Sequence, residues 1–127
     1  MPAEKFSFKS TPAQRSFGEH VMHIEQINMM VLKMMNAAAA APGVNEKAAT
    51  KADMIKAMSD SFDYGTAIIT EQTDASMAAS IQGPPWMGPS TRARIIAFLI
   101  GHTQDTYGQM VVYLRLNGLV PPASQRP

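Results

Sequence analysis

The sequence predicts an all-α fold, a helical bundle with three long helices. Apolar residues recur at three- and four-residue steps in three long segments, which is the spacing of a buried stripe on a helix. A serine or threonine suited to cap a helix lies at the start of each segment. The alternation of apolar and polar residues that marks a half-buried strand is absent from the sequence. At 127 residues, the chain is expected to form a single domain over residues 1–127.

The first predicted helix covers residues 12–38 and follows an extended lead-in of residues 1–11. Thr11 is its expected N-cap, Pro12 suits the first helical position, and Gln14 completes a capping box. A proline and a glycine shortly beyond the segment end the helix. Its expected buried stripe consists of Phe17, Val21, Ile24, Val31 and Met35.

The second predicted helix covers residues 51–70, after a polar connection that ends at Thr50. Its expected buried stripe consists of Met54, Ile55, Met58, Phe62 and Ile69. A long connection over residues 71–90 follows, with one expected helical turn around Ser76. Trp86 lies in this connection, in the segment GPPWMG. We expect it to pin the loop, and the alternative is that it lines the mouth of a pocket.

The third predicted helix covers residues 91–117 and ends at Gly118, since two prolines beyond that glycine prevent its continuation. Its central stripe consists of Ile95, Leu99, His102, Thr106, Met110 and Tyr113. Further apolar residues widen this surface on one side: Ile96, Ile100, Tyr107, Val111 and Leu114. Two neighbouring helices do not cover a surface this wide, so we expect another element to pack against it.

Composition excludes several classes of function. Eleven basic residues against ten acidic ones leave a net charge of +1, with no basic cluster for nucleic acid. There is no cysteine, so disulfides and cysteine-based zinc sites are excluded. The apolar runs are shorter than the roughly 20 residues that a membrane span needs, and the charged N-terminus does not look like a signal peptide. We therefore expect a cytoplasmic protein that binds neither nucleic acid nor membrane.

The three histidines are the candidate nitrogen ligands. His20 and His23 lie on the first helix, His20 near the centre of its apolar stripe and His23 nearer the edge. His102 lies within the stripe of the third helix, and an antiparallel arrangement brings it close to the level of His23. Imidazoles that converge from facing helices hold divalent ions. Either His20 or His23 could face His102. From the spacing alone, the favoured interpretation of His102 is a buried core histidine that hydrogen-bonds a neighbouring helix, with the metal site as the alternative.

Two segments carry a resemblance to a known family. The sequences TPAQRSFGEHVMHI at 11–24 and GHTQDTYGQMVVYLRLNGLVPPAS at 101–124 resemble the DinB/YfiT-like superfamily of metal-dependent enzymes. The resemblance implies a four-helix bundle with a long crossover, frequently dimeric. It implies a metal site with one histidine from the second family helix and a His-x-x-x-His pair from the fourth. Members of the family include thiol S-transferases and hydrolase-like and isomerase-like proteins.

Carried over by position, the family pattern assigns His23 and His102 as metal ligands. The third ligand falls on Thr106, which is a departure because a neutral hydroxyl is a poor ligand for zinc or nickel. Asp105 or His20 is the alternative third donor. We therefore expect a divalent metal, Zn²⁺ or Ni²⁺, to be weakly held or absent.

A second departure concerns the start of the chain. The segment that precedes the first predicted helix resembles the family's link between its first and second helices, so the first family helix is expected to be absent. Either a second subunit supplies the missing packing, or Met1 is internal to a longer chain. In the first case we expect a homodimer. Its expected interface is the face around Ile96, Ile100, Val111 and Leu114, or the side of the first helix that carries Met22 and Met29.

These inferences lead to one leading functional hypothesis and one alternative. The leading hypothesis is a DinB-like protein with a weakened or degenerate divalent-metal site. If the site is active, it serves a metal-dependent hydrolase or a thiol S-transferase that acts on an unidentified small molecule. The alternative is a non-catalytic, dimeric helical binding or interaction module on the same scaffold. The sequence does not decide whether the protein is an enzyme.

Overall fold

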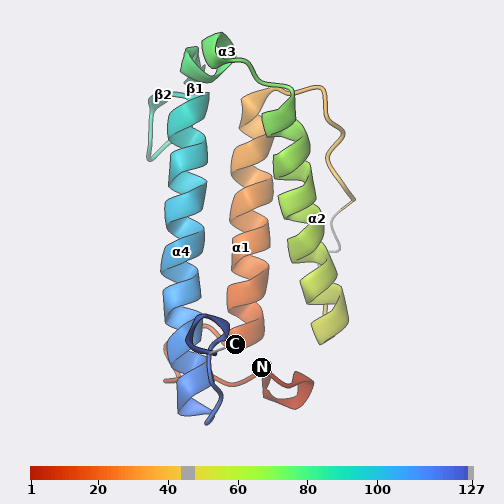
Figure 1. Cartoon of the computed structure of the whole chain (residues 1–127), viewed down its shortest axis with the longest axis vertical. Helices are drawn as coiled ribbons and strands as arrows, with labels where there is room; N and C mark the ends of the chain where they lie inside the picture. Colours follow the sequence, from red (N-terminus) through yellow and green to blue (C-terminus); the bar gives the residue numbers. More distant parts are fainter. Residues whose placement is uncertain (44–47, 126–127) are drawn as a thin grey trace.

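Three long helices dominate the computed structural model, which describes residues 1–43 and 48–125 (Figure 1). They are α1 (Phe17–Leu32), α2 (Lys51–Thr70) and α4 (Arg92–Leu116). The all-α prediction is confirmed, with α2 at the predicted bounds and α4 one residue shorter at each end than predicted. A short helix, α3 (Asp74–Ala78), includes the turn expected around Ser76. Within the described residues, no helix combines the length and apolar character needed to cross a membrane.

Helix α1 lies between the other two long helices and packs against both (Figure 1). It runs parallel to α2 and antiparallel to α4, so the chain must return along the length of the bundle before α2 begins (Figure 1). This return is a long crossover connection of the kind found in some helix bundles. The polar connection predicted before Thr50 falls partly on residues 44–47, which lie outside the described residues.

Helix α1 begins at Phe17, with Ser16 as its N-cap, so the predicted start at residue 12 with Thr11 as N-cap is wrong. The Ser16 hydroxyl accepts a hydrogen bond from the backbone N–H of Glu19 at 3.2 Å. The Glu19 carboxylate in turn accepts one from the backbone N–H of Ser16. Ser16 and Glu19 thus form the capping box. Around Thr11 there is only an isolated turn.

The lead-in explains why the helix starts at this point. The carbonyl of Phe8 accepts from the N–H of Phe17 at 3.0 Å, and the carbonyl of Phe6 accepts from Gly18 at 2.8 Å. With the capping box, these bonds satisfy the first N–H groups of the helix, which otherwise have no partner. The lead-in also contains a 3₁₀ turn, Ala3–Lys5. It is therefore a packed part of the fold and not a plain extended segment.

Helix α1 ends earlier than the predicted residue 38. The regular helix stops at Leu32 and continues as a 3₁₀ turn, Lys33–Met35. Asn36 follows in the left-handed region, with φ at 51°, and closes the turn. Asparagine adopts this conformation more readily than most residues, which accounts for the stop several residues before the proline and glycine.

Helix α2 turns a different face to the core than its apolar pattern predicts. Ile55, Phe62 and Ile69, three members of the predicted stripe, are 42%, 44% and 44% exposed. The buried face instead consists of Ala57, Ser61, Tyr64, Gly65 and Ile68, three of which are small. A methyl group added at Gly65 would lie 3.2 Å from a Leu32 methyl carbon. Close approach to α1 therefore favours glycine at this position, which a pattern of large apolar residues does not reveal.

A small antiparallel hairpin was not predicted. Strands β1 (Ser80–Gln82) and β2 (Pro89–Thr91) pair within the connection between α3 and α4. Strands of three residues are too short to show a recognisable alternation of polar and apolar positions. Through this pairing, the loop that carries Trp86 is held at the start of α4.

The buried apolar residues form two clusters, one toward each end of the bundle. The first consists of Met29, Val31, Leu32, Met35, Tyr64, Ile68, Ile95 and Leu99. The second consists of Phe6, Phe17, Val21, Tyr113 and Leu114. The helix segments between them carry buried polar residues, among them Glu25, Asn28, Ser61 and Thr106. The middle of the bundle is therefore its most polar buried region.

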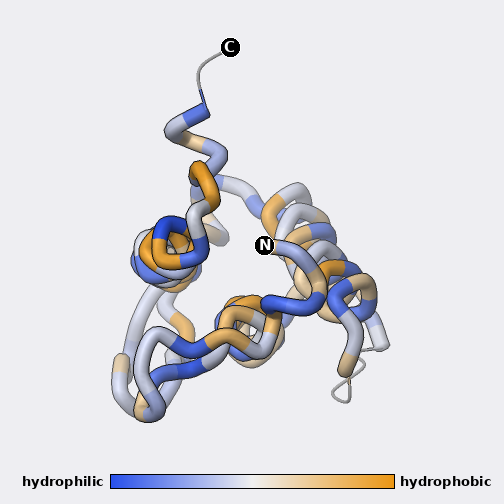
Figure 2. The backbone as a smooth tube through the Cα atoms, turned by 90° about the horizontal axis from the view of Figure 1, so that it is seen from below, coloured by the Kyte–Doolittle hydropathy of each residue, from blue (hydrophilic) through white to orange (hydrophobic). Residues whose placement is uncertain are grey.

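An apolar groove of about 270 Å³ lies between α2 and α4, with α1 at its floor. Seen along the bundle, α1 lies to one side of the two flanking helices (Figure 2). Large apolar residues form much of the groove lining: Leu32, Phe62, Ile69, Ile96, Leu99 and Ile100. No charged residue lines the groove in the described part of the chain. The wide apolar surface predicted for the third helix is thus partly open, and Ile100 is 60% exposed.

The capping box of α1 leads to a stability prediction. Replacement of Ser16 by alanine removes the cap acceptor, and we expect it to lower the free energy of unfolding by about 1 kcal/mol. Thr11→Ala is the matched control, because Thr11 has the same sequence signature but caps no helix. Urea denaturation of both variants measures the difference. Equal losses in the two variants would contradict the assigned start of α1.

Candidate histidine site

His23 on α1 and His102 on α4 lie side by side. Their Nε2 atoms are 3.1 Å apart, and their ring centroids are 4.9 Å apart. Both residues are partly buried, in the polar middle of the bundle. The structure thus brings together the two residues that the sequence analysis selects as metal ligands.

The contact between the two imidazoles requires one proton between them. A neutral imidazole carries a proton on one ring nitrogen and a lone pair on the other. For the two Nε2 atoms to form a hydrogen bond, one must donate and the other must accept. The Nδ1 atom of His102 is buried and has no hydrogen-bond partner among the described residues. An ion held by both Nε2 atoms would have to take the place of the proton that they share.

Burial keeps this pair neutral. It lowers the pKa of His23, and the charges of Arg15, His102 and His20 lower it further. Burial is also the main cause of the lowered pKa of His102, where the carboxylate of Asp105 acts in the opposite direction and Arg15 adds to the decrease. Neutral imidazole is the form that binds a metal ion, so both rings are in the required state at neutral pH.

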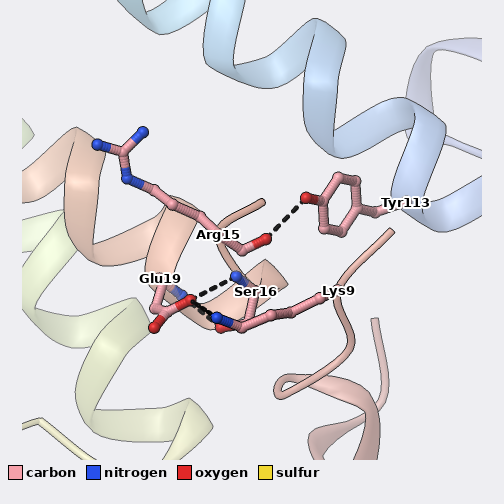
Figure 3. Close-up of polar contacts among 5 residues, drawn as sticks. All are labelled: Lys9, Arg15, Ser16, Glu19 and Tyr113. Carbon is pink, nitrogen blue, oxygen red and sulfur yellow. Dashed lines mark hydrogen bonds and ion pairs between the residues drawn. The ribbon is translucent and has the colours of Figure 1, made fainter. Parts of the chain in front are cut away.

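A hydrogen bond at the start of α1 helps to position α1 and α4 relative to each other (Figure 3). The hydroxyl of Tyr113, on α4, donates a hydrogen bond to the backbone carbonyl of Arg15 at 2.7 Å. Lys9 forms an ion pair with Glu19 at 3.3 Å, and Glu19 also belongs to the capping box. The guanidinium of Arg15 extends away from these groups (Figure 3). The carboxylate of Glu19 is therefore engaged by Lys9 and by the N–H of Ser16.

Neither alternative third donor joins the pair. His20 is 2% exposed and packs edge-on against the ring of Tyr113, with centroids 5.1 Å apart. Asp105 is exposed and accepts a hydrogen bond from the side chain of Gln109 at 2.9 Å. Thr106 is 2% exposed. In the part of the chain that the structure describes, no three His, Cys, Asp or Glu side chains are grouped so that they could hold a metal ion.

Two aromatic residues extend the site along α4. The ring of Phe98 stacks against His102, with centroids 5.8 Å apart and planes 30° apart. Trp86 in turn packs against Phe98, with ring centroids 4.7 Å apart. Phe98 was not predicted as part of the site, although its position one helical turn before His102 places it on the same face. The contact of Trp86 with Phe98 is compatible with the expected role of Trp86 in holding its loop.

A polar cavity of about 730 Å³ opens beside His23. Its walls come from the lead-in, the first turns of α1 and the residues just before and within α2. Lys9, Arg15 and Glu19 supply its charged groups. The cavity is large enough for a small molecule.

Comparison with known proteins identifies a family and a similar solved structure. The family model described as the DinB superfamily matches residues 1–110. A crystal structure of a DinB-like protein from Bacillus cereus ATCC 10987 is similar to this chain, with a TM-score of 0.67 and 20% sequence identity. The similarity covers 94% of this chain and 79% of that one. No curated protein matches the chain significantly.

The burial of His20 leads to a prediction about pH. Burial is the main cause of its lowered pKa, and the charge of Arg15 adds to it. Because the unfolded chain keeps the ordinary pKa of about 6.5, protons bind preferentially to the unfolded state. The protonation of His20 therefore costs no stability above this pH, and the free energy of unfolding decreases as the pH falls below it.

We expect His20→Phe to reduce the loss of stability at low pH, since an aromatic ring is retained and the titrating group is removed. Both ring nitrogens of His20 are buried without hydrogen-bond partners among the described residues. The variant should therefore also gain about 1 kcal/mol at pH 7. Urea denaturation between pH 7.5 and 5 measures both effects. The native chain over the same pH range is the control, because His23 and His102, whose pKa values are also lowered, remain in both proteins. An unchanged pH profile in His20→Phe would refute the assignment.

Proposed function

Because the chain belongs to the DinB superfamily, we propose that His23 and His102 form a weak divalent-metal site. The observation that supports this proposal is the 3.1 Å separation of their Nε2 atoms, which directs two neutral imidazoles at one point. The ion class is Zn²⁺ or Ni²⁺, both of which accept imidazole ligands. The site serves a hydrolase or thiol S-transferase that acts on a small molecule.

The donor set fits this metal only in part. Catalytic zinc sites usually have three protein ligands and leave the fourth position for water or substrate. Here two imidazoles are in place, and the family's third position is occupied by Thr106, whose hydroxyl is a poor donor. We therefore expect low affinity, with more than one position left to water or substrate.

The side chains around the pair have distinct roles in this proposal. A bound divalent ion supplies Lewis-acid activation of a water or a thiol. For both Nε2 atoms to bind an ion, the proton between them would have to move to an Nδ1 atom, which leaves each ring neutral. Further protonation of the imidazoles competes with the ion, so affinity decreases as the pH falls. Phe98 covers one face of His102 and excludes water from it. The cavity beside His23 offers room for part of the small molecule.

The open groove between α2 and α4 supports a second proposal, a homodimer. Exposed apolar residues on both walls, Phe62 and Ile69 on α2 and Ile100 on α4, would be covered by a second copy of the chain. Of the interface alternatives from the sequence, the side with Met22 and Met29 is wrong. These two residues are only 8% and 4% exposed. Leu114, expected in the other interface, is also buried.

The homodimer is compatible with either functional hypothesis. If the histidine pair binds no metal, the same scaffold is a non-catalytic binding or interaction module. Metal binding and dimerisation use different faces, because the groove lining does not include His23 or His102. The two proposals are therefore tested separately.

The missing third ligand leads to a prediction about affinity. We expect Thr106→His to raise the affinity for Zn²⁺ or Ni²⁺ at least about tenfold, or ~1.4 kcal/mol, because a third imidazole completes the usual set. Isothermal titration calorimetry on tag-free protein measures the change, and circular dichroism checks that the buried substitution is accepted. His23→Ala should abolish the gain.

Tyr107→His is the matched control for this experiment. It adds an imidazole at the neighbouring, more exposed position of α4 and should leave the affinity unchanged. If a folded Thr106→His variant shows no gain, the proposed geometry of the site is wrong. If the native protein retains stoichiometric metal after treatment with a chelator, the expected weak affinity is wrong.

The homodimer is tested by size-exclusion chromatography with light scattering. We expect the native chain to have twice its monomer mass at micromolar concentration. Ile100→Lys should produce a monomer, because it places a charge in the proposed interface. Ala97→Lys is the control, since Ala97 is exposed on the same helix but does not line the groove. A monomeric native protein would rule the proposal out.

A further inference from the structure

We propose that Trp86 and Phe98 form an aromatic platform that binds a planar ring of the small-molecule substrate beside the histidine pair. This inference rests on the proposed function for the existence of a substrate and adds the chemical class of its binding group. The ligand class is a small molecule with an exposed aromatic ring. Trp86 is a binding residue in this proposal and not a catalytic one.

The aromatic rings form a continuous series. Trp86 contacts Phe98, Phe98 contacts His102, and His102 contacts His23, with centroid separations of 4.7, 5.8 and 4.9 Å. The residues come from the hairpin loop, α4 and α1. Four rings thus form one continuous series that ends at the two imidazoles. A ring bound on Phe98 would lie next to His102, and a ring bound on Trp86 would lie one side chain further from it.

Trp86 is unusually exposed. Its side chain is 58% exposed, although tryptophan is usually largely buried. Its packing on Phe98 covers only part of the ring and leaves a flat apolar surface open. Aromatic rings bind such a surface by offset stacking or edge-on contact, which contributes binding free energy in addition to that from the burial of apolar area. A saturated ring of the same size gains binding free energy only from the buried area.

The loop that presents Trp86 is rigid. The N–H of Gly83 bonds the carbonyl of Gly88 at 3.1 Å, and the N–H of Gly88 bonds the carbonyl of Pro84 at 2.9 Å. A side chain at Gly83 would approach the Gly88 carbonyl to 2.8 Å, and Gly88 has a φ of +66°. Both glycines are therefore required. A loop held this tightly presents Trp86 with little loss of conformational entropy on binding.

The experiment compares two neutral probes of similar size, benzyl alcohol and cyclohexylmethanol. Trp86 is the only tryptophan of the chain, so its indole N–H gives a single, unambiguous signal in a nitrogen-proton correlation spectrum. We expect benzyl alcohol to shift this signal and the ring signals of His102, with an affinity about two- to tenfold higher than that of cyclohexylmethanol. Equal affinities, or a shift of the indole without one of His102, would overturn the proposal.

Substitutions of Trp86 test whether this residue is the source of the preference for the aromatic probe. Trp86→Phe should retain it, because a ring remains, whereas Trp86→Leu should remove it and leave cyclohexylmethanol binding nearly unchanged. In these variants the shifts of His102 report binding, and thermal denaturation checks the fold. Tyr107→Leu is the matched control, since it removes a partly exposed ring elsewhere on α4 and should keep the preference. A Trp86→Leu variant that still prefers the aromatic probe would refute the platform.

The outcome is independent of the metal site. Neither probe is a chelating ligand for a metal ion, and the titrations are done in the presence of a chelator. If the aromatic preference is found but Thr106→His gains no metal affinity, the platform stands and the metal proposal fails. If metal binds but the aromatic preference is absent, the platform fails and the metal proposal stands.

Discussion

The geometry of the histidine site depends on how the first turn of α1 is held. Its first N–H groups bond to Phe8, Phe6 and Ser16, and Glu19 returns a bond to Ser16. A buried N–H without a partner is costly, so this turn cannot slide along the chain. Since a helix is rigid over two turns, the fixed start also fixes the direction of His23. The bond from Tyr113 to the Arg15 carbonyl ties α4 to the same point and so helps to set the level of His102.

Much of the fold could be predicted from the sequence, and the errors have physical causes. Two capping signatures follow one another, at Thr11 and at Ser16, and local rules do not distinguish them. The choice depends on the carbonyls of Phe6 and Phe8, which reach α1 only through tertiary packing. The face of α2 was predicted from its large apolar residues. Packing against α1 favours glycine at position 65, a preference that hydropathy does not show.

The candidate site was predictable where helical spacing and family resemblance agree. Both point to His23 and His102, and the structure places these rings together. Trp86 could not be placed in the same way, because the tip of a hairpin bears no fixed spacing to a helix that follows it. Its contact with Phe98 depends on the pairing of two strands of three residues each. Contacts of this kind are set by the folded chain and have no local signature.

The cluster at the lower end of the bundle also has a consequence for the protein during its synthesis. Phe6, Phe17 and Val21 share this cluster with Tyr113 and Leu114, and the bond between Tyr113 and Arg15 joins residues 98 positions apart. The early residues leave the ribosome first, and although Phe6 and Phe17 contact each other, their partners on α4 are absent until that helix has been translated. Their aromatic side chains are therefore accessible to chaperones for most of translation. The two imidazoles, which also come from α1 and α4, meet only at the end of that process.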